Sequence, residues 1–313
     1  MKKTQSRASW RPDKILSVSN TGEGAVPLLD LMISAFPEFN RTRIKSLLKH
    51  GQVRVAGSLA PRHDTPVEQG GQIEVNLTRP FATFRHPRLS LVYEDNDILV
   101  INKGYGLLSM GTDSARKDVT AYSALKDYVK RQHPSNKVFI VHRLDRDTSG
   151  LMMFARTEEA KDAMQHNWNN MVIERNYLAV LEGVLEEDSG VVRSHLEENS
   201  RFEVYTTHVK GQGKLAVTRY KVLARGQGYT LVRFSLDTGR KNQIRVHASD
   251  LGHPIVGDRK YGASASPIHR LALHAASLKF VHPVTRRLME FTLPVPSRFA
   301  GLVKYGHFEQ KSE

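Results

Sequence analysis

The spacing of hydrophobic residues predicts a helix early in the chain. In VPLLDLMISAF (residues 26–36) apolar side chains recur every three or four residues, which is the period of one helix face. The apolar positions are Leu28, Leu29, Met32, Ile33 and Phe36. Pro37 follows, and it cannot continue a helix because it lacks a backbone N–H. We therefore expect this helix to end before Pro37.

A second helix and two short strands are predicted directly after it. Asn40 is a suitable N-cap for RTRIKSLLKH, in which Ile44, Leu47 and Leu48 form an inward stripe, and Gly51 is a stop signal. QVRV and QIEV follow as strands, separated by a turn at residues 56–58. This pattern predicts a small α/β unit of two helices and a sheet.

Longer strand patterns begin near residue 90. LSLVYEDNDILV reads as two strands around a turn, and FIV (139–141) and LMMFA (151–155) as buried strands, with helical patterns between later strands. Five parts are expected: a flexible basic tail (1–22), the small unit (23–78), a linker (79–89), a larger domain (90–300) and a C-terminal tail (301–313).

Composition narrows the possible chemistry. The 313 residues include no cysteine, which excludes disulfides, thiolate nucleophiles and cysteine-based metal sites. The sequence has neither an HExxH pair nor a phosphate-binding GxxxxGK[ST] loop. No apolar run is long enough to span a bilayer, and the basic N-terminus lacks a signal-peptide core. We expect a cytoplasmic protein with no membrane partner and no metal.

Net charge points toward an anionic partner. The chain carries +14, and residues 1–90 hold 14 Lys and Arg against 7 Asp and Glu. Such a balance is typical of nucleic-acid binding, although a basic soluble enzyme remains an alternative. The charged residues of the second predicted helix and of the following strand are all positive, with no glutamate among them. The candidate RNA-binding residues here are Arg41, Arg43, Lys45, Lys49 and Arg54. A solvated helix face is the alternative reading.

The segment VHRLDRDTSG (141–150) places a carboxylate on a bend between two predicted strands. Asp145 is flanked by Arg143 and Arg146, and Thr-Ser-Gly favours a tight turn. From these residues alone, Asp145 is either part of a structural ion pair or part of a reactive site.

Four segments resemble the RluA-type pseudouridine synthase family. HRLDRDTSG fits the motif HRLDxxTSG, and ERNYLA (174–179) fits the tyrosine motif. TGRKNQIRVH (238–247) fits TGRxHQIRxH with Asn242 in place of His, and INKGYGL (101–107) fits INKPxGL with Gly104 in place of Pro. The resemblance covers roughly residues 90–296. RTRIKSLLKHGQVRVAG (41–57) separately resembles the αL-type RNA-binding domain of a ribosomal protein.

The resemblance implies a fold and an activity. The fold class would be α+β. Residues 90–300 would be a catalytic domain with a mixed, mainly antiparallel sheet and flanking helices, and residues 23–78 a small α/β RNA-binding domain. The family detaches uracil from its ribose in RNA, turns it and rejoins it through carbon five, without a cofactor. Asp145 would be the catalytic carboxylate, by covalent attack or by way of a glycal. Arg245 would be its basic partner, and Tyr177 would pack on the flipped base.

The implied partner is RNA, and the protein is expected to be a monomer. Arg143, Arg146 and Arg240 are further candidate RNA contacts. Large-subunit ribosomal RNA is the expected substrate, with transfer RNA as an alternative. A non-catalytic RNA-binding or ribosome-assembly factor on the same fold is a second hypothesis. A glycosidase acting on small molecules is a third, but such enzymes generally use two carboxylates, and Asp147 is the only second acid nearby in the sequence.

Overall fold

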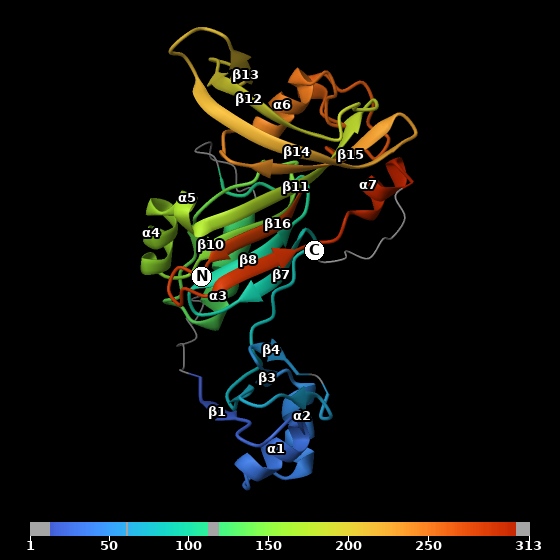
Figure 1. Cartoon of the computed structure of the whole chain (residues 1–313). Coiled ribbons are helices and arrows are strands. Elements are labelled where there is room, and N and C mark those ends of the chain that lie inside the picture. The colour runs from blue at the N-terminus through green and yellow to red at the C-terminus, as the bar shows by residue number, and fades with distance from the viewer. Residues whose placement is uncertain (1–12, 61, 112–118, 305–313) are drawn as a thin grey trace, which may run out of the picture. The chain divides into compact units, whose positions relative to one another are not determined.

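The chain folds into two compact units. The computed structural model describes residues 13–60, 62–111 and 119–304. The division between the units falls between Thr83 and Phe84, and Figure 1 shows the smaller N-terminal unit in blue. Each unit has its own buried apolar core.

The first unit contains the two predicted helices and a small sheet. Asn40 caps the second helix, its side chain accepting a hydrogen bond from the backbone N–H of Arg43 at 2.8 Å. Ile44, Leu47 and Leu48 are buried as predicted. The strands of the main sheet lie in the order β1-β6-β3-β4, and β2 pairs with β5. The elements are β1 (Ile15–Ser19), β2 (Val26–Pro27), α1 (Leu28–Ala35), α2 (Arg41–Lys49), β3 (Val53–Val55), β4 (Ser58–Leu59), β5 (Pro66–Val67) and β6 (Gln72–Asn76).

The expected tail of residues 1–22 is wrong for its second half. Strand β1 pairs antiparallel with β6 along its whole length. Leu16 and Val18 alternate with polar residues and pack against the core of the first unit, so this short strand has one apolar face. Residues 1–12 lie outside the described part of the chain.

The second unit is built on one large sheet with helices against it. Nine strands follow the order β13-β12-β14-β15-β11-β16-β10-β8-β7, with β17 pairing β16 and β9 pairing β10. Its elements are β7 (Leu89–Glu94), β8 (Ile98–Lys103), α3 (Ala121–Gln132), β9 (Phe139–Ile140), β10 (Ser149–Ala155), α4 (Glu158–His166), α5 (Trp168–Met171), β11 (Val172–Glu182), β12 (Ser189–Glu198), β13 (Val204–Thr207), β14 (Lys214–Gly226), β15 (Tyr229–Leu236), α6 (Gln243–Asp250), a 3-10 turn (Arg259–Tyr261), β16 (Leu273–Val281), β17 (Leu288–Thr292) and α7 (Ser297–Leu302).

The sheet is mixed and mainly antiparallel, which confirms the expected α+β class. Among the described strands, β10 and β16 form the parallel pair. Helix α6 packs on β13 and β14, α4 on β10, and α7 on β11 and β15 (Figure 1). No helix in the described ranges is both long and apolar enough to cross a membrane.

Strand β10 carries the segment that follows Asp145 into the core. All of its residues are buried, whereas the predicted buried strand before it, β9, is only half-buried. Gly150 adopts a φ of +115°, and a Cβ there would lie 2.2 Å from the backbone oxygen of Ala275. Glycine is therefore required where β10 meets β16, and it fixes the end of the Asp145 loop against the sheet.

The second unit extends beyond the expected boundary at residue 300. Helix α7 runs to Leu302, and Val303 is buried in the core of the unit. The backbone oxygen of Val303 lies so close to Gly226 that a Cβ there would be 2.7 Å away. The expected C-terminal tail is therefore wrong for residues 301–303, and residues 305–313 lie outside the described chain.

Candidate active site

Asp145 lies in a loop that is fixed on both sides. The preceding residue, Leu144, is buried, and its backbone N–H and C=O both bond the hydroxyl of Ser109, at 3.2 and 2.6 Å. On the other side, the backbone N–H of Thr148 donates to the carbonyl of Asp145 at 3.2 Å. The carboxylate itself is 29% exposed, so it is accessible while its backbone is held.

A fully buried lysine supports the same loop. The ammonium of Lys103, at the end of β8, donates to the backbone carbonyls of Gly104, Leu107 and Arg146 at 3.0, 2.8 and 3.0 Å. Burial lowers the pKa of Lys103 to about 8, against the attraction of nearby Asp147 and Asp145. Lys103 was not a predicted site residue, and the signal for it was a lysine at the end of a strand that begins with four apolar residues.

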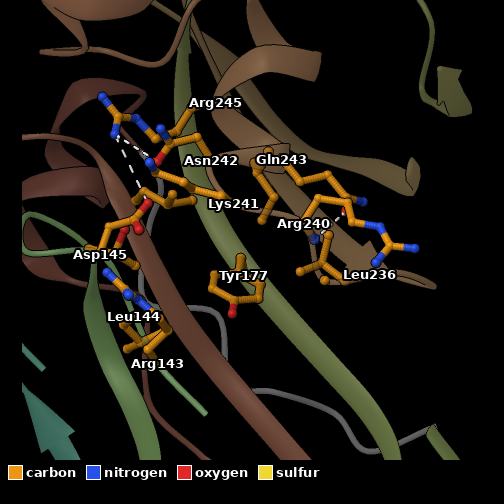
Figure 2. A pocket seen from close by; sticks show the side chains of 14 residues that line it. Arg143, Leu144, Asp145, Tyr177, Leu236, Arg240, Lys241, Asn242, Gln243 and Arg245 are labelled. Atoms are coloured by element: carbon orange, nitrogen blue, oxygen red, sulfur yellow. Dashed lines mark hydrogen bonds and ion pairs between the residues drawn. The ribbon is translucent and has the colours of Figure 1, made fainter. Parts of the chain in front are cut away.

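Arg245 connects Asp145 to a second, buried carboxylate. Its Nη1 lies 4.0 Å from Asp145 Oδ2, and its Nε and Nη2 each donate to Asp258 at 2.7 Å. Nη1 also donates to Asn242 Oδ1 at 3.2 Å, and the guanidinium carbon lies 4.8 Å from the Tyr261 ring centre. Figure 2 shows Arg245 above Asp145. The bidentate pair with Asp258 fixes the plane of the guanidinium.

This arrangement keeps Arg245 charged. Burial opposes the charge, but the hydrogen bonds and attraction of Asp258, with a smaller contribution from Asp145, outweigh it and raise the pKa of Arg245. The Asp258 side chain is only 1% exposed. Sequence reasoning missed Asp258, because it lies 13 residues beyond Arg245 in a segment read only as a glycine- and proline-containing loop.

The turn before α6 is attached to the sheet by one buried amide. Gln243 Oε1 accepts from the hydroxyl of Thr238 and the backbone N–H of Arg240, at 2.8 and 2.9 Å. Gln243 Nε2 donates to Val217 O at 3.0 Å and to Thr218 Oγ1 at 2.8 Å. These bonds hold the turn that carries Arg240.

Asn242 occupies the position immediately before α6 and has a left-handed backbone with φ of 55°. Its side-chain amide donates to the hydroxyl of Tyr261 at 3.0 Å, while its oxygen accepts from Arg245. Asn242 therefore connects the Arg245 guanidinium to the aromatic ring beneath it.

Tyr177 lines the same cavity as Asp145. It lies on β11, opposite Ala275 of β16 and Phe234 of β15. Burial raises the pKa of Tyr177 to about 12, with repulsion from Asp145 adding to the effect and Arg175 opposing it. The cavity measures about 220 Å³, and Figure 2 shows Tyr177 between the Asp145 loop and the turn at Arg240. The structure thus brings together all three residues predicted for chemistry.

The predicted RNA-binding residues fall into three groups. Arg143 and Arg240 line the cavity with Asp145. Arg146 instead lines an adjoining cavity and forms an ion pair with Asp147 at 3.2 Å. The remaining five belong to the first unit. The side chains on helix α2 are exposed: Arg41, Arg43, Lys45 and Lys49.

Arg43 also contacts a ring, its guanidinium carbon lying 5.0 Å from the Phe39 ring centre, but its side chain is exposed. Arg54 differs from those four helix residues in its burial. It is half-buried, its guanidinium carbon lies 4.3 Å from the Phe81 ring centre, and it donates to the backbone oxygen of Ala82 at 3.3 Å. These contacts hold the start of the segment between the units on the first unit.

One group of potential metal ligands occurs within the described ranges. Oxygen and nitrogen atoms of Asp95, Asp97 and His282 lie within 4.8 Å of one another. Asp95 already accepts from the Tyr93 hydroxyl at 2.8 Å and is paired with His282 at 3.0 Å. Its other oxygen accepts two backbone N–H bonds. The group is therefore accounted for as a support for the β7–β8 turn.

Comparison with known proteins identifies the family. The model of the RNA pseudouridylate synthase family matches residues 97–250. The chain is 35% identical over 274 residues to an uncharacterized RNA pseudouridine synthase, YlyB, of Bacillus subtilis, covering 85% of this chain and 89% of that protein. It is 34% identical over 288 residues to ribosomal large subunit pseudouridine synthase D of Pasteurella multocida, covering 86% and 87%.

Solved structures agree with this assignment. Human RNA pseudouridylate synthase domain containing 4 superposes with a TM-score of 0.57 at 25% identity, covering 69% of this chain and 92% of that one. Human RNA pseudouridylate synthase domain containing 1 gives a TM-score of 0.55 at 28% identity, covering 68% and 86%. With the sheet, the Asp145 loop and the Arg245 contact in place, the chain belongs to the RluA-type family of RNA pseudouridine synthases.

Proposed function

We propose that the protein converts uridine to pseudouridine in large-subunit ribosomal RNA, with Asp145 as the catalytic carboxylate. The observation that carries this proposal is the accessible Asp145 carboxylate facing a guanidinium that Asp258 fixes in place. The relatives named as ribosomal large subunit synthases support the choice of RNA, and from that substrate we infer a cytoplasmic location.

The reaction is an isomerisation within one nucleotide. The bond between uracil N1 and ribose C1′ breaks, the base turns, and a bond forms between C5 and C1′. The C5 proton is then lost and N1 gains a proton, so no atom or electron is added overall. Asp145 acts at the sugar, and its carboxylate must be ionised to do so. The guanidinium of Arg245 lies 4.0 Å from this carboxylate and attracts it.

Tyr177 contributes mainly as a surface for the turning base. Its ring lines the cavity between Asp145 and Arg240, where a pyrimidine can pack on it. With a pKa of about 12, its phenol stays neutral at physiological pH and is a poor general base. Arg143 and Arg240 would contact the flipped nucleotide or its phosphates.

The target base has to leave its stack to reach this cavity. Flipping costs a few kcal/mol and costs least in loops and single strands, which are also where proteins read RNA sequence. We infer that the first unit acts as an αL-type RNA-binding domain, with the exposed cations of α2 on phosphates. A monomer has all the residues required.

The test is pseudouridine mapping of total RNA from cells that lack the gene. Restoration with wild type should return the missing sites, restoration with Asp145→Asn should not, and Asp188→Asn is the control. Asp188 has a side chain that is 86% exposed and pairs with Arg225. If the sites that depend on the gene lie in transfer RNA, transfer RNA replaces ribosomal RNA as the proposed substrate. No change at any site, with RNA still bound, would leave a non-catalytic RNA-binding factor as the better account.

A further inference from the structure

A second, larger cavity lies on the other side of Arg245. It measures about 590 Å³, and Arg245 lines both cavities. Asp145 lines the first cavity and the next residue, Arg146, lines the second. Further walls come from the bend after β8, at Tyr105, and from the loop after α6, at Arg259 and Lys260. The two cavities therefore adjoin at Arg245 and at the neighbouring residues Asp145 and Arg146.

The second cavity favours an anion. Its two acids are already neutralised, since Asp258 pairs with Arg245 and Asp147 pairs with Arg146. Four more cations line it, and none of them has a carboxylate partner within 4.0 Å in the described residues: Arg88, Arg259, Lys260 and Arg270. This excess of positive charge matches a phosphodiester, which Arg and Lys bind through charge-assisted hydrogen bonds.

The loop that presents Arg259 and Lys260 is held rigidly. Gly257 has a φ of +79°, and a Cβ there would lie 2.3 Å from the backbone oxygen of Arg270. The N–H of Gly257 donates to Ala265 O, and the N–H of Tyr261 donates to Asp258 O, at 2.9 and 3.0 Å. The two cations therefore project from a fixed backbone, so a bound phosphate would require little ordering of the loop.

An aromatic side chain completes the cavity. Tyr105 is 43% exposed, and its ring centre lies 4.6 Å from the guanidinium carbon of Arg270. Arg270 is in turn fixed by a 2.7 Å bond to the Ser149 hydroxyl. An exposed ring beside unpaired cations is the combination by which proteins hold an unstacked nucleotide, with the base on the ring and the phosphate on the cations.

We propose that this cavity binds the nucleotide adjacent to the target uridine in the RNA, with Arg259 and Lys260 on its phosphate and Tyr105 under its base. This inference rests on the proposed function, which places the target uridine at Asp145. The cavity keeps the neighbouring nucleotide away from the stack while the target base turns.

The first experiment measures the salt dependence of RNA binding. The full-length wild type and Arg259→Ala/Lys260→Ala are titrated with a labelled oligouridine at several salt concentrations. Each lost phosphate contact on a single strand lowers the slope of log K against log salt by roughly 0.7, so the variant should lose about 1.4. Arg286→Ala/Arg287→Ala, an exposed pair on the β16–β17 turn, is the matched control and should keep the wild-type slope.

The second experiment tests the base contact. Tyr105→Leu should weaken oligouridine binding about 5- to 100-fold, in line with the loss of one base stack, while Tyr105→Phe keeps the ring and the affinity. Inorganic phosphate at matched ionic strength should not displace the oligouridine. An unchanged slope in Arg259→Ala/Lys260→Ala, an equal loss in the control pair, or displacement by phosphate alone would overturn the proposal.

Turnover separates this inference from the proposed function. On the RNA identified by mapping, Arg259→Ala/Lys260→Ala should raise KM and leave kcat within about twofold of wild type. If the wild type forms no pseudouridine, the proposed function is contradicted. If the wild type is active and the variant has the same KM and kcat, nucleotide binding in the second cavity is contradicted. The salt slope decides the binding claim in either case.

Discussion

Arg245 has unequal contacts with two carboxylates, and the difference gives each acid a separate task. The pair with Asp258 is short, bidentate and buried, whereas the pair with Asp145 is 4.0 Å long and partly exposed. Asp258 therefore fixes the guanidinium, and Asp145 keeps an oxygen available to a substrate. At the scale of single residues, we therefore propose that reactivity at Asp145 depends on an acid that does not line its cavity.

Asp258→Asn tests that dependence. The substitution keeps the shape but leaves the buried guanidinium without its charge partner, so we expect a loss of roughly 3–5 kcal/mol in unfolding free energy together with a lower kcat. Denaturant unfolding and single-turnover kinetics measure the two effects. Asp237→Asn is the control because its pair with Arg219 is largely exposed and should be worth less than about 1 kcal/mol. Equal effects of both substitutions would contradict the assigned role.

Tyr177 gives a prediction about pH. Since its pKa is raised to about 12, the phenol is neutral from about pH 6 to about pH 10, and its ionisation cannot shape the rate in that range. Tyr177→Phe should therefore lower kcat by the same factor at every pH, leaving a profile parallel to wild type. Tyr177→Ala, which also removes the ring, should in addition raise KM. A wild-type rate that climbs with pH while Tyr177→Phe stays flat would instead identify the phenolate as a base.

At the scale of elements, the Asp145 loop is held between β8 and the β10–β16 pair. Lys103 reaches from the end of β8 to the carbonyl of Arg146, and Ser149 bonds His274 of β16 at 2.8 Å. Gly150 allows β10 and β16 to approach within the distance this pairing needs. The loop is thus fixed largely by residues outside its own sequence, on β8, on β16 and at Ser109.

Gly150→Ala should break this arrangement. A methyl group would collide with the backbone of Ala275, and the φ of +115° is unfavourable for alanine, so we expect a loss of more than ~3 kcal/mol. Gly301→Ala, in α7 with open space around its Cβ, should be neutral or stabilising by up to ~1 kcal/mol. Thermal unfolding of both variants checks the difference, and a similar melting temperature for the two would exclude the close approach as a determinant.

The elements that could be predicted from sequence are those specified by neighbouring residues. The stripe of Ile44, Leu47 and Leu48 and the cap at Asn40 are local, and so both predictions are confirmed. Strand β1 was missed because its partner lies more than 50 residues away in β6. Lys103 and Asp258 were missed because their contacts are also formed only by the fold. Lys103 donates to a carbonyl 43 residues along the chain, and Asp258 pairs with Arg245 of α6 across the loop that follows this helix.

At the scale of the whole molecule, the two units each contain a group of cations proposed to contact RNA. One group lies on the exposed face of α2 in the first unit, and the other lines the pair of cavities in the second. Phosphate contacts position an RNA without reading its sequence. We therefore propose that the first unit provides general affinity for RNA and that the second positions the RNA locally.

The exposed cations of α2 are tested by the triple variant Arg41→Ala/Lys45→Ala/Lys49→Ala. It should raise KM for the mapped RNA and leave kcat unchanged. The slope of log K against log salt should fall by about 2, because roughly 0.7 is lost for each phosphate contact. The matched control is Lys126→Ala/Lys130→Ala/Arg131→Ala, which removes three exposed cations from helix α3 of the second unit. Filter binding and steady-state kinetics provide the readouts. A reduced kcat at saturating RNA, or an equal effect of the control, would contradict a purely positioning role for α2.

The left-handed backbone at Asn242 explains which side chains suit that position. A positive φ is unfavourable for most L-amino acids, but asparagine, aspartate and histidine adopt this backbone conformation several times more often than the others. The sequence motif has histidine where this chain has asparagine, and the two share this conformational tolerance as well as the capacity to hydrogen-bond. Asparagine at this position therefore suits the left-handed backbone, but it cannot take up a proton as histidine can.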